Sequence, residues 1–231
     1  MKNLRKMMAW ALLLIFPLNT YTQNTERRDA GDFHSISVTG KIRVELYPSG
    51  ERFIEVIAGG TEAVNVITEI REKELAIRLK PNTPKEADIK VKVYFTGVDM
   101  LSVQAKGLIV CPDTLRAESM IFNARSGGKM ELWMNLGSLE ATVTQGGILV
   151  FSGQVEDQEI SVASGATYSA FRLEAHETRV KAVTGGKAKV TASEAIHANA
   201  NTGGYIGYRG DPGKTSVKTS LGGEIVHEGT R

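Results

Sequence analysis

The sequence of 231 residues contains a single cysteine, Cys111, so no disulfide can form within one chain. Cys111 stands in the apolar run Gly-Leu-Ile-Val-Cys-Pro, and a thiol in such a run is typical of a buried, unreactive side chain. A catalytic thiol would need a histidine partner, and the sequence identifies none. The stability of the chain must therefore come from packing and hydrogen bonds.

A large net charge is also lacking. The chain has 28 Lys and Arg against 26 Asp and Glu, and three of the basic residues lie within residues 1–22. Residues 23–231 therefore keep 25 basic and 26 acidic groups, a net charge of −1. Nucleic acids and anionic membrane surfaces are bound through basic patches, so neither is predicted as a partner.

No apolar run is long enough to span a membrane comfortably. Residues 7–18 form an apolar run of 12 residues, whereas a transmembrane helix needs about 20. Three basic residues precede this run and polar residues follow it, so residues 1–22 are predicted to be a secretory signal peptide. Cleavage is placed near Thr22 or Gln23, with an uncleaved membrane anchor as the alternative. The remaining chain is expected in the periplasm, at the cell surface or outside the cell, with no stable membrane span.

Glycine, in contrast, recurs at regular intervals after residue 100. The steps between these glycines are 20, 19, 19, 20, 18 and 19 residues, and the positions are Gly107, Gly127, Gly146, Gly165, Gly185, Gly203 and Gly222. A period near 19 that persists over six steps predicts a repeat architecture.

Short alternating runs flank each glycine. Apolar or small residues stand five and three residues before it and three and five residues after it, as Phe122, Ala124, Met130 and Leu132 do around Gly127. Period two on both sides predicts two short strands per repeat with one face turned inward. The glycine lies where the chain must bend. We therefore predict an all-β fold, a parallel β-helix with about 19 residues per coil, and the chirality of parallel crossovers favours the right-handed form.

The first half of the chain alternates as strands do but lacks the 19-residue period. We divide the sequence into a signal peptide (1–22), a flexible leader (23–32), an N-terminal β-strand region (33–104) and the repeat β-helix (105–231), with 33–231 as one continuous unit. Region 33–104 forms either irregular first coils or an antiparallel sheet. A cap is expected there, because an exposed terminal coil is an edge that invites aggregation.

Three patterns in the first half resemble a known family. They are F-x-x-I-x-V-x-G-x-I-x-V-x-L at 33–46, V-I-x-G at 56–59 and E-L-x-I-x-L at 74–79. Together with the glycine-rich coils they resemble the auto-transporter adhesin head GIN domain over about residues 30–231. The resemblance implies a β-helix-like all-β fold and an exported location, and it suggests adhesion. It carries over no catalytic residues.

Catalysis is the first alternative, because many β-helices cleave polysaccharides. Glycoside cleavage needs a carboxylate pair at a set separation, but Asp113, Asp157 and Asp211 stand at different offsets from the repeating glycines. The four histidines share no spacing typical of zinc sites. We therefore assign no catalytic residue, metal or cofactor, and a polysaccharide lyase or hydrolase is left as the alternative.

Binding is the favoured interpretation. The residue four before each glycine should point outward, and stacked coils would align these residues into a polar ladder: Asn123, Thr142, Ser161, Lys181, Asn199 and Lys218. Trp133 and Tyr205 are predicted outward aromatics that could stack on sugars. These weak candidates indicate an adhesin-like envelope protein that binds a glycan or an envelope or extracellular protein. A structural or scaffolding role is the other alternative, and the oligomeric state is not assigned.

Overall fold

The computed structural model describes residues 24–229, and this part of the chain is built almost entirely of strands. The predicted signal peptide lies outside the described residues. Within residues 24–229, no helix has the length and apolar character needed to cross a membrane. In this described part of the chain, the one helical element is a short 3-10 turn, η1, at Ala63–Asn65.

The strands fall into an N-terminal group and a repeating group. The first comprises β1 (Asn24–Asp29), β2 (Ser35–Thr39), β3 (Arg43–Pro48), β4 (Phe53–Gly59), β5 (Val66–Arg71), β6 (Glu74–Leu79) and β7 (Asp88–Phe95). The second comprises β8 (Met100–Gln104), β9 (Leu108–Ala124), β10 (Lys129–Val143), β11 (Ile148–Ala163), β12 (Thr167–Val183), β13 (Lys187–Thr191), β14 (Ala195–Asn201), β15 (Tyr205–Arg209), β16 (Lys214–Ser220) and β17 (Glu224–His227).

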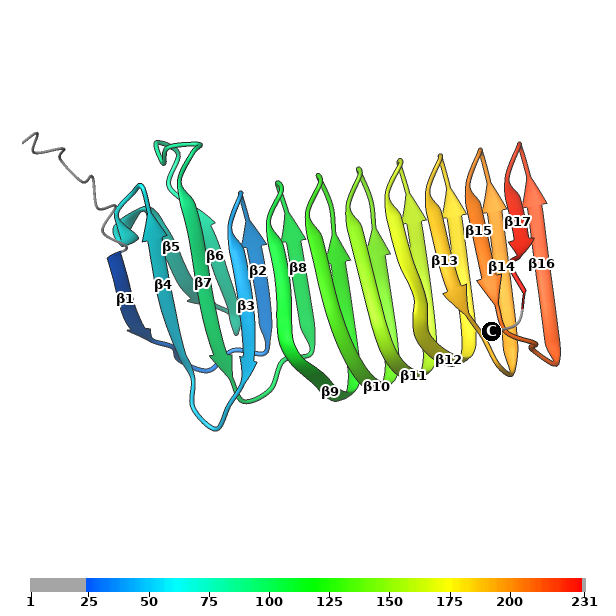
Figure 1. Ribbon diagram of the computed structural model, residues 1–231, viewed down its shortest axis with the longest axis horizontal. Coiled ribbons are helices and arrows are strands. Elements are labelled where there is room, and N and C mark those ends of the chain that lie inside the picture. The colour runs from blue at the N-terminus through cyan, green and yellow to red at the C-terminus, as the bar shows by residue number, and fades with distance from the viewer. Residues whose placement is uncertain (1–23, 230–231) are drawn as a thin grey trace, which may run out of the picture.

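The second group forms a parallel β-helix, as predicted (Figure 1). β10 pairs in parallel with β9 on one side and β11 on the other, and β11 continues in parallel to β12. β12 is then followed by two parallel series, β13–β15–β17 and β14–β16. Each coil descends from a tight turn, rounds a corner and rises to the next turn.

The repeating glycines form the tight turns. In each of the seven turns both central residues have a positive φ, as in Gln145 (φ 50°) and Gly146 (φ 71°), which is the type I′ arrangement. The turn is closed by a 2.9 Å bond from the Gly147 amide to the Thr144 carbonyl. A Cβ at Gly147 would lie 2.6 Å from the Ala124 carbonyl oxygen of the preceding coil. In a turn with two glycines, the first therefore adopts the positive φ that the turn requires, and the second leaves room for the backbone of the preceding coil.

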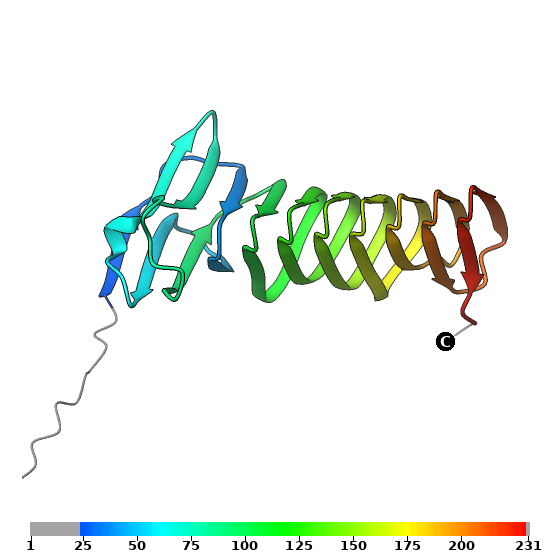
Figure 2. The same cartoon turned by 90° about the horizontal axis from the view of Figure 1, so that it is seen from above.

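The N-terminal group is both coil and cap, so each of the two sequence alternatives describes part of it. β2 and β3 form a coil that stacks in parallel on β8 and β9. β6 and β7 form a further coil outside it, although they come later in the sequence. β4 and β5 then run antiparallel to β7 and β6, at the end of the row of coils (Figure 2).

The segment expected as a flexible leader is instead a strand over most of its length. β1 pairs antiparallel with β4 over its whole length, from Asn24 with Ala58 to Asp29 with Phe53. Arg28 fixes it further, because its guanidinium donates to the Val66 carbonyl at 2.7 Å and the Ala63 carbonyl at 2.9 Å. Polar composition suggested a leader because one face of an edge strand is solvated and carries little apolar signal.

One continuous core runs from Phe33 to Ile206 and contains most of the inward positions predicted for the repeat. Phe122, Ala141, Leu149 and Val162 are all at most 1% exposed. The last coil differs: Val217 holds an inward position but is 48% exposed, because no strand within residues 24–229 packs on the far side of β16. His227, also at an inward position, is exposed and stacks on Tyr208 with 4.7 Å between ring centres.

A buried polar network inside the coils was not predicted. The Tyr168 hydroxyl donates to Gln158 Oε1 at 2.8 Å, and Gln158 Nε2 donates to Thr178 Oγ1 at 2.9 Å. Thr178 Oγ1 in turn donates to the Thr191 carbonyl at 2.8 Å. Burial raises the pKa of Tyr168 well above its ordinary value, so the phenol remains a neutral donor. Each polar group is thus paired inside an otherwise apolar interior.

The Tyr168→Phe protein is expected to lose about 1–3 kcal/mol of unfolding free energy, because the buried Gln158 Oε1 then has no donor. The measurement is urea unfolding followed by circular dichroism. Tyr208→Phe is the control, since Tyr208 is half-buried and stacks through its ring. Equal stability of the Tyr168 and Tyr208 variants would contradict the network's contribution.

Candidate functional site

The six predicted ladder residues lie side by side on one face of the β-helix. Strand register pairs Asn123 with Thr142, Thr142 with Ser161, and Ser161 with Lys181. It then pairs Lys181 with Asn199 and Asn199 with Lys218. All except the half-buried Asn123 are exposed. Because parallel coils repeat at about 4.8 Å, the ladder is an uninterrupted row of outward polar side chains.

The ladder extends toward the N-terminal end beyond the predicted residues. Ser102 pairs with Asn123, and Ser37 pairs with Ser102. The sequence interpretation missed Ser102 because it aligned Gly107 with Gly127. The Gly107 amide bonds to the Gln104 carbonyl as the Gly128 amide bonds to the Arg125 carbonyl, so Gly107 corresponds to the second glycine of later turns. Counting from residue 106 places Ser102 in the ladder.

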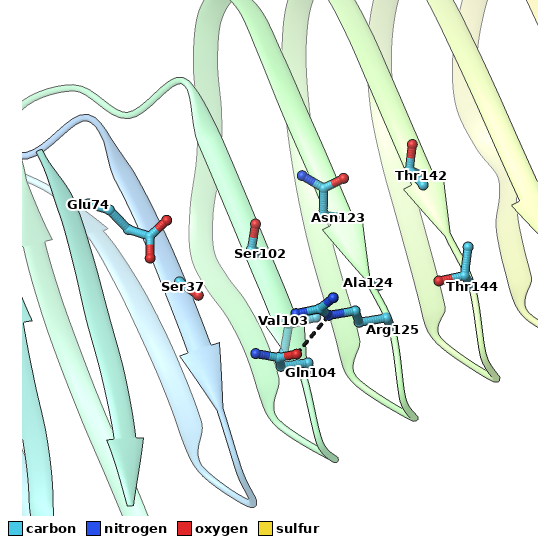
Figure 3. A pocket seen from close by; sticks show the side chains of 10 residues that line it. All are labelled: Ser37, Glu74, Ser102, Val103, Gln104, Asn123, Ala124, Arg125, Thr142 and Thr144. Atoms are coloured by element: carbon cyan, nitrogen blue, oxygen red, sulfur yellow. Dashed lines mark hydrogen bonds between the residues drawn. The ribbon is translucent and has the colours of Figure 1, made fainter. Parts of the chain in front are cut away.

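A shallow groove of about 580 Å³ lies over this end of the ladder (Figure 3). Its wall holds a chain of polar contacts: Arg125 Nε donates to Gln104 Oε1 at 2.7 Å, and Gln104 Nε2 donates to Thr39 Oγ1 at 2.8 Å. The groove is lined by Ser37, Glu74, Ser102, Val103, Gln104, Asn123, Ala124, Arg125, Thr142 and Thr144. These groups offer hydroxyl, amide and guanidinium donors along a surface open to solvent, which suits an extended polar ligand.

Trp133 lies outside the ladder, on the descending part of its coil before the corner. It is 53% exposed and separates two depressions of about 500 and 290 Å³ that share Trp133 and Arg172. We call this surface the Trp133 groove; its polar residues are Thr114, Arg116, Glu131, Asn135, Ser152, Gln154, Arg172 and Glu174. The sequence identified Trp133 but not these neighbours.

Tyr205, the other predicted aromatic, is half-buried on the descending side of a later coil. Its hydroxyl donates to Glu228 Oε1 at 2.8 Å. That hydrogen bond, with a further contribution from burial, raises the pKa of Tyr205. The structure therefore does not bring Tyr205 together with Trp133 or with the ladder.

The described residues give little support for a reactive cysteine or for a metal site. Cys111 is half-buried, and its Sγ donates to the Leu46 carbonyl at 3.3 Å. Burial raises the pKa of its thiol, which disfavours the reactive thiolate. His176 Nδ1 lies 2.9 Å from a Glu156 oxygen, but no group of three His, Cys, Asp or Glu side chains within residues 24–229 could hold a metal ion.

Solved structures with this fold include proteins from Bacteroides and Parabacteroides species. A protein described as a putative adhesin from Bacteroides fragilis NCTC 9343 matches with a TM-score of 0.77 at 14% identity, covering 91% of this chain and 97% of that one. A putative adhesin from Parabacteroides merdae ATCC 43184 matches with a TM-score of 0.69 at 16% identity, covering 90% and 98%. A protein described as a putative lipid binding protein from Parabacteroides distasonis ATCC 8503 matches with a TM-score of 0.67 at 16% identity, again covering 90% and 98%. At these identities the likeness is one of fold.

The search of curated protein sequences gives no match. A family model does match, over residues 32–212, and its description is "Putative auto-transporter adhesin, head GIN domain". This range contains the motifs at 33–46, 56–59 and 74–79 and most of the glycine-rich coils. The chain therefore belongs to the auto-transporter adhesin head GIN domain family.

Proposed function

We propose that this chain is an exported, non-catalytic binding protein of the cell envelope that holds an extended ligand along its polar ladder. The observation that carries the proposal is the register of the ladder, which runs without a break from Ser37 to Lys218. A row of donors and acceptors at one fixed spacing suits a polymer with repeated polar groups. The ligand class is a glycan or an extracellular protein segment.

Two further features support an envelope location and a binding role. Residues 1–22 have the charge and apolar pattern of a secretory signal peptide, and the family is described as adhesin-like. The groove over the ladder is also open to solvent and lined largely by polar side chains. A surface of this kind binds by many weak contacts along its length rather than by enclosing a small molecule.

Substitution of Thr142 and Ser161 by lysine is expected to weaken ligand retention at least tenfold, because two long charged side chains then stand at the middle of the row. Purified protein is immobilised, and retention of mucin, collagen, fibronectin and soluble polysaccharides is measured by biolayer interferometry. The control is Thr167→Lys with Ser169→Lys, which adds the same charge at two half-buried positions at the start of β12, away from the ladder.

Protease treatment of intact cells gives the location. If protease-treated cells contain less of the protein than untreated cells, the protein lies on the outer surface, in agreement with adhesion. Full protection would place it in the periplasm and contradict the adhesin role. Equal loss of retention in the ladder variant and its control would also count against the ladder as the binding surface.

A further inference from the structure

Trp133 differs from the other aromatic residues that the structure describes. Phe122, Phe151 and Tyr168 pack against one another inside the coils in tilted and edge-on contacts, and the Phe171 ring is covered by the Arg209 guanidinium at 4.2 Å. Trp133 has neither an aromatic nor a cationic partner and is the one aromatic in residues 24–229 that is classed as exposed. About half of a large indole thus stays in water and gains nothing from burial, so its exposure calls for a reason.

We propose that the Trp133 groove is a glycan-binding subsite in which the indole stacks on a sugar ring. This site is separate from the ladder and does not depend on the ladder's role. The ligand would be a pyranose unit of a polysaccharide, because such a ring has an apolar face for the indole and equatorial hydroxyls for the surrounding polar side chains.

The indole of Trp133 lies beside the side chains of the neighbouring coils. In the row across the coils, Trp133 is followed by Ser152 and then by Arg172. Ser152 points outward, with a short side chain, yet is only 3% exposed, so its longer neighbours lie over it. Trp133 nevertheless keeps 53% of its surface open. The side chain is thus supported from below while a broad area of the ring is available to a ligand.

The next row supplies the polar contacts. Arg116, Asn135 and Gln154 stand in register on successive coils, about 4.8 Å apart, and all three line the larger depression beside Trp133. Amide side chains donate and accept together, and guanidinium groups donate through several N–H bonds in one plane. Adjacent hydroxyls of a sugar present donors and acceptors at similarly short intervals, so two neighbouring side chains can bind one ring.

The same features disfavour a protein partner as the occupant. Protein interfaces bury a central anchor within a surrounding area of about 800 Å² on each side, with apolar contacts at its centre. Here the surroundings of the indole are polar and partly charged, and the aromatic stands alone. An isolated aromatic platform beside amides and guanidinium groups matches the mixed character of a sugar ring better than an apolar hot spot.

Tryptophan fluorescence provides a direct test. The sequence contains two tryptophans, Trp10 and Trp133, so the full chain with Trp10→Phe reports on Trp133 alone. The probes are polygalacturonate, xylan, laminarin, hyaluronan and solubilised peptidoglycan strands. We expect at least one polysaccharide to shift or quench the emission saturably and to retard the protein in affinity gel electrophoresis.

Variants then assign the effect to the groove. In affinity electrophoresis, Trp133→Ala should weaken binding of the active polysaccharide at least tenfold, Trp133→Phe should retain part of it, and Asn135→Ala with Gln154→Ala should weaken it several-fold. The ladder variant Thr142→Lys with Ser161→Lys should bind it as the unchanged protein does.

Absence of binding to all five probes would overturn the proposal, and so would full binding by Trp133→Ala. Capture of a protein that depends on Trp133, with no glycan retained, would assign the groove to a protein partner instead. Because the ladder variant is measured in parallel, a negative result for the Trp133 groove can be told apart from a negative result for the ladder as a binding surface.

Discussion

The Gly153→Ala protein is expected to be among the least stable single variants of this chain. Gly153 has a φ of +116°, a backbone conformation that an L-residue with a side chain rarely adopts. A Cβ at this position would also be placed on the carbonyl oxygen of Met134 in the preceding coil. Strain of about 1–3 kcal/mol from the dihedral adds to a similar cost for overpacking, so we expect a loss of roughly 2–6 kcal/mol.

Gly146→Ala is the matched control for this prediction. Gly146 also has a positive φ, +71°, but a Cβ there would meet no atom within 4 Å. Only the conformational cost of about 1–2 kcal/mol applies, and Gln145 beside it already adopts φ 50° with a full side chain. Chemical denaturation of the two variants separates the effects. A Gly153 variant that is no less stable than the Gly146 variant would contradict the close approach of the coils at Met134.

The repeat half of the fold was predictable because its signals are local. Alternation around each glycine depends only on which side of one strand a residue faces, and this is why Ala141 and Leu149 are buried where the pattern placed them. The positive φ of the turn and the close approach of the coils both favour glycine, and five of the seven turns carry a Gly-Gly pair. A feature repeated in most coils is visible without knowledge of the partner strands.

The N-terminal half could not be derived in the same way. β6 and β7 stack outside β2 and β3, so order in space differs from order in sequence. Alternating apolar residues are equally compatible with the parallel neighbour of β7, which is β3, and with its antiparallel neighbour, β4. The pattern identifies strands but does not choose their partners, because pairing is decided by contacts between distant segments.

The Trp133 groove could also be predicted only in part, because the sequence pattern does not show the register between neighbouring strands. Trp133 itself was predicted as an outward aromatic from its parity in the strand. Arg172 joins its row only because the pairing of β11 and β12 shifts by one residue between Val150 and Ser152, where the extra residue Phe171 is accommodated. A bulge of this kind re-aims the side chains that follow it. Counting from the nearest glycine, without the bulge, places Arg172 on the wrong face.

Phe151→Ala is expected to destabilise the chain by about 3–5 kcal/mol, because Phe151 is the central ring of the interior stack. Its ring centre lies 4.8 Å from that of Phe122 and 5.7 Å from that of Tyr168, and Phe151 is 1% exposed. Removal of the ring leaves a cavity between side chains from β9, β11 and β12. The coils on either side bury their faces only against their neighbours, so the cavity cannot be closed by movement of one strand alone.

Hydrogen exchange measured by mass spectrometry shows which strands the Phe151→Ala substitution destabilises, and by how much. In a linear stack of coils, stability is a sum of coil and interface contributions, so Phe151→Ala should reduce protection most in β9 to β12 and least in β4 and β7 of the cap. Phe151→Leu keeps most of the volume and should cost less than about 1.5 kcal/mol. Uniform loss of protection from the cap to β15 would mean that the chain unfolds as one cooperative unit and that the stack does not behave as separable coils. Restricted loss around β11 would show instead that the cap and the far coils hold independently of the central aromatic layer.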